Sequence, residues 1–182
     1  MKRIIFIMLV FGTLFTSCGE DDWSNDNSTM EHVYYYGFQD WGNLKNNVVY
    51  NLAQGETVAV ATQFWSEYTR SYSPKVSYYV SNVPGKEDLA LGVDYQIVDK
   101  DGNSIRPNDN GSYEMIWPNA VKGIQYVYVK ALNGKKGSIR LLTSNPGKTM
   151  DNMDIESTII VKTDQYEVRA FTENYYVTIK IQ

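Results

Sequence analysis

The chain of 182 residues carries 17 basic and 21 acidic residues, which gives a net charge of −4, and 43% of its residues are hydrophobic. This length suits one domain with a substantial core, and an acidic chain without a Lys/Arg cluster is poorly suited to bind the phosphate backbone of a nucleic acid. With one cysteine, Cys18, and one histidine, His32, both in the N-terminal part, a thiolate zinc site, a disulfide and a Ser-His-Asp triad are excluded from the domain that follows.

The first 18 residues resemble a bacterial lipoprotein signal. Lys2 and Arg3 form a positive n-region, and the apolar run of residues 4–15 is long enough for export but short of the roughly 20 residues that span a bilayer. Residues 14–18 (Leu-Phe-Thr-Ser-Cys) resemble the lipobox, in which the cysteine is lipidated and becomes the mature N-terminus. We therefore predict lipidation of Cys18, with an ordinary cleaved signal peptide as the alternative. Cleavage removes two basic residues and leaves a net charge of −6.

A short acidic run, residues 19–22 (Gly-Glu-Asp-Asp), directly follows the predicted lipidation site. It resembles the surface-export signal of Bacteroides-type lipoproteins, which implies a lipid-anchored, surface-exposed location at the outer membrane. The polar stretch of 19–32 has few apolar residues, and we interpret it as a flexible tether between the lipid and the domain. No second apolar run approaches the length of a membrane span, so attachment to the membrane would depend on the lipid.

From Val33 onward, short runs of alternating apolar and polar residues are typical of half-buried strands. The runs are residues 57–65, 75–81, 93–97, 125–131, 139–141, 157–162, 166–170 and 175–182. Asp-Gly or Asn-Gly dipeptides at 101–102, 110–111 and 133–134 are typical of the tight turns that join strands. Seven to nine short strands without a helical stripe predict an all-β fold, an antiparallel β-sandwich.

Part of the chain, residues 76–147, resembles a Calx-beta module. Residues 76–80 (Val-Ser-Tyr-Tyr-Val) and 91–95 (Leu-Gly-Val-Asp-Tyr) are similar to that family's strand, loop and Gly-x-Asp-Tyr sequence. The strands and turns that follow in the family are matched in order by residues 113–118, 124–129 and 141–146. The same layout resembles small lipoproteins of unknown function from gut Bacteroides. The resemblance implies an immunoglobulin-like β-sandwich.

Calcium binding by such modules requires clustered carboxylates, since calcium takes six to eight oxygen ligands. Asp94 matches one position of that scheme, but Lys135 and Lys136 stand where further acidic residues are expected. We therefore expect Asp94 to cap backbone N–H groups in a tight corner. Residues 99–103 (Asp-Lys-Asp-Gly-Asn) resemble the start of a calcium loop, but the glycine is fourth rather than sixth and Asn110 is twelfth, so we expect a hairpin turn. No metal site and no cofactor are predicted.

Aromatic residues are the remaining candidates for binding, since 12 of the 25 fall between Tyr34 and Tyr79. Trp65, Tyr68 and Tyr72 lie at the end of one predicted strand and in the following loop. Sugars present apolar C–H faces that stack on exposed rings, while polar neighbours fix their hydroxyl groups. We therefore predict Trp65, Tyr68 and Tyr72 as ligand-binding residues, with packing in the core or on a sheet face as the alternative.

These patterns predict a signal peptide at 1–17, the lipidated cysteine and acidic tether at 18–32, and a single β-sandwich domain at 33–182. The leading hypothesis is a non-catalytic cell-surface lipoprotein that binds a glycan for a surface uptake system. A structural or protein-interaction subunit of an outer-membrane complex is the alternative. Calcium-dependent adhesion is a third and would need at least three carboxylates near Asp94. No catalytic residue is predicted, because the acidic residues are scattered outside any recognisable motif.

Overall fold

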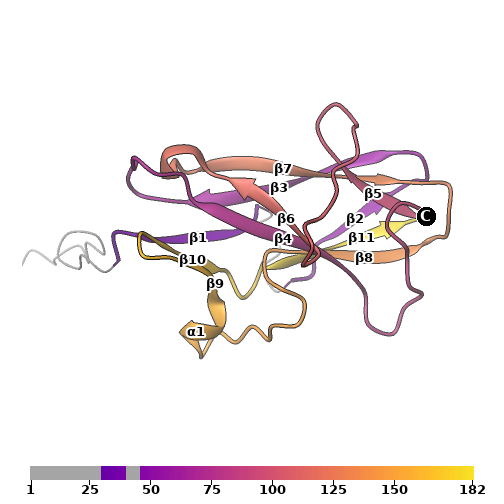
Figure 1. The fold of residues 1–182 in the computed structure, drawn as a ribbon. Coiled ribbons are helices and arrows are strands. Elements are labelled where there is room, and N and C mark those ends of the chain that lie inside the picture. Colours follow the sequence, from indigo (N-terminus) through magenta and orange to yellow (C-terminus); the bar gives the residue numbers. More distant parts are fainter. Residues whose placement is uncertain (1–29, 40–45) are drawn as a thin grey trace, which may run out of the picture.

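The computed structural model describes residues 30–39 and 46–182, which form two β-sheets packed face to face (Figure 1). One turn of 3₁₀-helix, η2 (Pro118–Ala120), and one of α-helix, α1 (Ile155–Thr158), interrupt the strands. The predicted β-sandwich is confirmed.

The first sheet has six strands and the second has five. In spatial order, the first sheet contains β5 (Tyr95–Val98), β7 (Gly123–Ala131), β3 (Thr57–Trp65), β1 (Val33–Phe38), β10 (Glu167–Ala170) and β9 (Ile159–Lys162). The second contains β2 (Val49–Leu52), β11 (Tyr176–Ile181), β8 (Gly137–Leu142), β4 (Lys75–Asn82) and β6 (Ser112–Ile116).

Two of the strand pairs are parallel, β1 with β10 and β2 with β11, and the others are antiparallel. The sequence predicts only antiparallel pairing, because its turn dipeptides report on strands that are neighbours in the chain. The parallel pairs join strands from opposite ends of the sequence, and they bring the segment after β10 next to β1.

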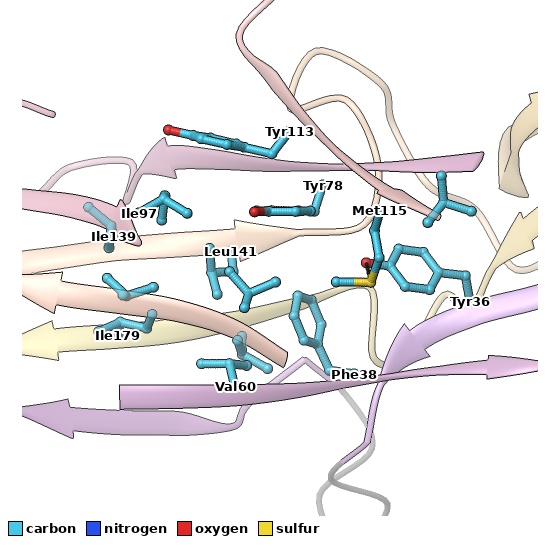
Figure 2. Close-up of a cluster of buried hydrophobic side chains, with 14 of the residues drawn as sticks. Tyr36, Phe38, Val60, Tyr78, Ile97, Tyr113, Met115, Ile139, Leu141 and Ile179 are labelled. Carbon is cyan, nitrogen blue, oxygen red and sulfur yellow. Dashed lines mark hydrogen bonds between the residues drawn. The ribbon is translucent and has the colours of Figure 1, made fainter. Parts of the chain in front are cut away.

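The core lies between the sheets and is built by the alternation of apolar residues along each strand. On β11, Val177, Ile179 and Ile181 are at most 1% exposed. On β3, Val60 and Phe64 are fully buried. Burial of each such side chain stabilises the fold by roughly 1.5–3 kcal/mol. Figure 2 shows side chains of both sheets meeting in this core: Tyr36, Phe38, Val60 and Ile97 from the first sheet, and Tyr78, Ile139, Leu141 and Ile179 from the second.

Among the described residues, no helix is long and apolar enough to cross a membrane. The predicted signal peptide and the predicted lipidation site, Cys18, lie outside the described ranges.

Candidate functional site

Three aromatic rings meet on the outer face of the first sheet, and we call Tyr35, Trp65 and Phe171 the aromatic cluster. Tyr35 of β1 is the register partner of Trp65 at the end of β3. Phe171 directly follows β10, which pairs with β1 on its other side. The ring centroids of Tyr35 and Phe171 are 5.2 Å apart in a stacked arrangement, and Trp65 meets Phe171 edge-on at 4.9 Å. Each ring is partly exposed, so the cluster offers aromatic surface to a ligand.

Gly37 makes room for this cluster on the outer face of β1. A Cβ atom at this position would lie 2.6 Å from Asn174 Oδ1 and 3.0 Å from Cδ2 of Phe171. Asn174 is buried and donates a hydrogen bond of 2.6 Å from Nδ2 to the carbonyl oxygen of Phe38. The absence of a side chain at position 37 therefore lets Phe171 and Asn174 close over the strand.

Two hollows flank the aromatic cluster and share Met30 and Tyr35 in their walls. The first hollow, of about 500 Å³, is lined by Met30, Val33, Tyr35, Trp65, Ser66, Glu67 and Lys122. The second hollow, of about 410 Å³, is lined by Met30, Tyr35, Asn152, Ile155, Thr158, Arg169, Ala170, Phe171 and Thr172. Each hollow combines apolar surface with hydroxyl, amide or charged groups, which is the composition of small-ligand sites.

Each hollow has a basic side chain in its wall and an acidic side chain in its wall or next to it. Glu67 and Lys122 line the first hollow and are exposed. In the second, Arg169 Nε donates a hydrogen bond of 2.6 Å to Oε1 of Glu167. Burial opposes the charge of Arg169, but its hydrogen bonds with Glu167 and Tyr35 outweigh that effect and raise the pKa of the guanidinium. Lys162 Nζ also lies 3.4 Å from Glu167, so two cations share this carboxylate.

The three ring residues predicted from the sequence lie in different surroundings. Trp65 belongs to the aromatic cluster and lines the first hollow. Tyr68 is 41% exposed on the loop after β3, and the guanidinium of Arg70 lies 5.3 Å from its ring centroid. Tyr72 contacts Tyr34, which is 1% exposed and lies on the inner face of the first sheet, in the core. Trp65 and Tyr72 are therefore on opposite sides of the first sheet.

Tyr72 is held by polar and aromatic partners. Its hydroxyl lies 2.6 Å from the hydroxyl of Tyr34 and hydrogen-bonds with Nδ1 of His32. Its ring stacks on Tyr166 with centroids 5.6 Å apart. Burial and then the hydrogen bond to Tyr34 raise the pKa of Tyr72 above its ordinary value. This arrangement fixes the loop against the sandwich and leaves the Tyr72 hydroxyl engaged with other groups of the protein.

The residues just before β1 also contact the sandwich. Arg70 donates a hydrogen bond of 2.8 Å to the carbonyl oxygen of Glu31 and lies 3.6 Å from its carboxylate. His32 reaches Tyr72, as described above. These contacts begin before residue 33, where the sequence analysis places the boundary between the tether and the domain.

The carboxylates considered for calcium serve the backbone instead. Asp94 is 3% exposed and accepts hydrogen bonds from the backbone N–H groups of Ala90 (2.7 Å) and Lys135 (2.6 Å), as the sequence predicts. Asp99 accepts from the N–H groups of Asp101 and Asn103, both at 2.9 Å, in the expected hairpin turn. Within residues 30–39 and 46–182, no three His, Cys, Asp or Glu side chains are grouped as metal ligands.

Two members of the aromatic cluster, Tyr35 and Phe171, are absent from the predicted site. The position of Tyr35 can be inferred from the run Tyr34–Tyr36, because successive side chains of a strand face opposite sides of the sheet. Tyr34 and Tyr36 are buried in the core, so the ring between them faces outward. The position of Phe171 cannot be inferred in this way. Its position depends on the parallel pairing of β1 with β10, which links residues far apart in the chain.

Comparison with known proteins finds neither a matching family model nor a matching curated protein. Solved structures with a similar fold include the apo form of the Calx CBD1 domain, at 12% identity and a TM-score of 0.40, covering 82% of this chain and 99% of that domain. CaCohA2 from Clostridium acetobutylicum is 13% identical with a TM-score of 0.39, covering 82% of this chain and 92% of that protein. The third ScaB cohesin of R. flavefaciens, solved in complex with a group 1 dockerin, is 13% identical with a TM-score of 0.31, covering 87% of this chain and 98% of that chain. These identities and scores are too low to transfer a ligand or a partner.

Proposed function

We propose that this chain is a non-catalytic lipoprotein of the outer-membrane surface that binds a glycan at the aromatic cluster. The observation that carries the proposal is the contact of three partly exposed rings beside two hollows with polar walls. Aromatic planes stack on the C–H faces of sugars, and polar side chains around them fix the hydroxyl groups. Such a surface serves capture of a ligand without any chemical step.

The carboxylates near the hollows favour binding over hydrolysis. Most glycoside hydrolases use two carboxylates about 5–9.5 Å apart on either side of the scissile bond. Of the described residues that line the two hollows, Glu67 is the single carboxylate. Without a second carboxylate facing it, this arrangement supports a binding module.

The predicted lipid anchor sets where such a module would work. Met30 lines both hollows and is 12 residues from Cys18. An extended chain spans at most about 3.6 Å per residue, so 12 residues reach roughly 40 Å. With lipid on Cys18, the aromatic cluster stays within roughly that distance of the membrane surface, where a captured glycan can be passed to an uptake system.

Isothermal titration tests the glycan proposal. The mature chain of residues 18–182, with Cys18→Ser to prevent lipidation, is titrated with a panel of plant and host polysaccharides. We expect saturable binding that Trp65→Ala weakens roughly tenfold, since an aromatic contact contributes about 1.5 kcal/mol. Tyr126→Ala is the matched control, because Tyr126 is a 50% exposed ring of the same sheet that lines neither hollow. Absence of binding to every polysaccharide would reject the proposal.

A protein partner is the second candidate, and a different observation favours it. The loop between β8 and β9 carries α1, which lies beside the edge strand β9 (Figure 1). In this loop, Met153 is 88% exposed and Ile155 is 59% exposed. Neighbouring exposed apolar side chains are typical of protein contact sites. Met153 lines neither hollow. Capture of one defined outer-membrane protein that is lost in Met153→Ser would support this role, whereas unchanged capture by that variant would contradict it.

A further inference from the structure

The two hollows adjoin at the aromatic cluster, because both are lined by Tyr35. We call the route from one hollow to the other over this cluster the binding path. Trp65 lines the first hollow, Phe171 lines the second, and Tyr35 lines both. The ring centroid of Phe171 lies 4.9 Å from that of Trp65 and 5.2 Å from that of Tyr35. An extended ligand that occupied both hollows would therefore lie over aromatic surface between them.

Each hollow also offers its own hydrogen-bonding groups. The first has the hydroxyl of Ser66, which donates to the carbonyl oxygen of Tyr68 and can still accept a hydrogen bond. The second has the amide of Asn152 and the hydroxyl of Thr172. The second hollow is closed on one side by the loop that carries α1, since Asn152 and Ile155 belong to that loop. Each hollow is by itself within the size range of about 300–1,000 Å³ typical of small-ligand sites.

The charges along this path favour a neutral ligand. Glu67 and Lys122 have opposite signs in the first hollow. In the second, Arg169 hydrogen-bonds to Glu167, a carboxylate that it shares with Lys162. Each hollow thus has an acidic side chain near its cation, and an acidic sugar polymer would approach a mature chain of net charge −6.

We infer that the ligand is a neutral oligosaccharide chain bound along its length, with at least one sugar ring in each hollow and the linkage between them passing over Tyr35. This inference rests on the proposed function and names the ligand class of the same site. The binding path selects chain segments over single sugars, because both hollows must be filled for full affinity. The loop that carries α1 determines what fits in the second hollow.

A length series tests this inference with the mature chain that carries Cys18→Ser. The probes are malto-, cello-, xylo- and manno-oligosaccharides of two and six units, with oligogalacturonides of the same lengths as acidic counterparts. We expect a neutral six-unit chain to bind at least tenfold more tightly than the two-unit chain of the same series, and the oligogalacturonides to bind more weakly than either. Trp65→Ala and Asn152→Ala, one from each hollow, are each expected to remove most of the gain in affinity between two and six units.

The outcomes separate the inference from the proposed function. Equal affinity for two and six units, or tighter binding of the oligogalacturonides, would overturn the inference while leaving glycan binding intact. Loss of the length dependence in the control Tyr126→Ala would also overturn it, since that side chain lines neither hollow. Absence of binding to every oligosaccharide and polysaccharide tested would reject the proposed function and the inference with it.

Discussion

Gly37 is the position where a single added carbon atom should disturb the candidate site most directly. In Gly37→Ala, the new Cβ would lie 2.6 Å from Asn174 Oδ1 and 3.0 Å from Phe171 Cδ2, so at least one of the two side chains must move. Overpacking of this kind destabilises a protein by about 1–3 kcal/mol. The loss of glycine's freedom in the unfolded chain offsets about 0.4–1 kcal/mol of that. We therefore expect a net loss of about 1–2 kcal/mol in the free energy of unfolding.

Thermal unfolding followed by circular dichroism measures this effect, and for a chain of this size 1–2 kcal/mol corresponds to a fall of roughly 2–8 °C in Tm. Gly123→Ala is the matched control. Gly123 is also a strand residue, but the nearest heavy atom to its added Cβ is Cζ3 of Trp117 at an ordinary 3.9 Å. Its Tm should stay the same or rise slightly. If both variants unfold at the wild-type temperature, the tight packing described around Gly37 is wrong.

The remaining predictions concern the loop after β3, the corner at Asp94 and the anchor. Tyr72→Phe removes the hydroxyl that is hydrogen-bonded to Tyr34, and we expect it to lower the free energy of unfolding by about 1 kcal/mol in denaturant titration. Tyr68→Phe, at an exposed ring, should leave the free energy unchanged. Equal denaturation midpoints for the two variants would contradict this assignment. Hydrogen bonds from two backbone N–H groups lower the pKa of Asp94 in the folded protein. The ionised carboxylate therefore stabilises the fold fully above the unfolded pKa of about 3.9, and this stabilisation is lost as the pH falls through the lower pKa of the folded state. Asp94→Asn should therefore lose less Tm than the wild type between about pH 5 and pH 2, and parallel curves would refute the argument. Cys18→Ser in the full chain is expected to abolish labelling by an alkyne fatty acid and release the protein from the membrane fraction, and a labelled variant would exclude Cys18 as the lipidated residue.

Local alternation predicts much of the fold because one face of each strand is buried. The inward positions of β3 and of β11 follow directly from period-two patterning, and the burial of Val60 and Ile179 agrees with it. Turn chemistry likewise predicts the hairpin at Asp99 and the backbone role of Asp94, since both depend on side chains bonding to nearby N–H groups.

The candidate site is less accessible from the sequence, because it depends on pairing between distant segments. Trp65 is selected by its place at the end of a strand, but its neighbour Phe171 reaches it only through the β1 and β10 pair. The surroundings of Tyr72 are likewise not predictable from the sequence. An aromatic residue in a polar loop suggests exposure, yet its contacts with Tyr34 and Tyr166 are set by the way in which the loop folds back over the sheet.

The two parallel pairs also determine when the chain can fold. β1 is an inner strand of its sheet, but its partner β10 is synthesised more than a hundred residues later, and β11 in turn fills the place between β2 and β8. Long-range pairing of this kind makes folding slow, since the closure entropy of a long loop must be overcome before contacts form. The first sheet is incomplete until β10 is present, and the second is incomplete until β11 is present. Pairs such as β1 with β3 lie early in the chain, but the sandwich of a chain emerging N-terminus first stays incomplete for nearly its whole length. Such late completion would suit the export that the first 17 residues predict.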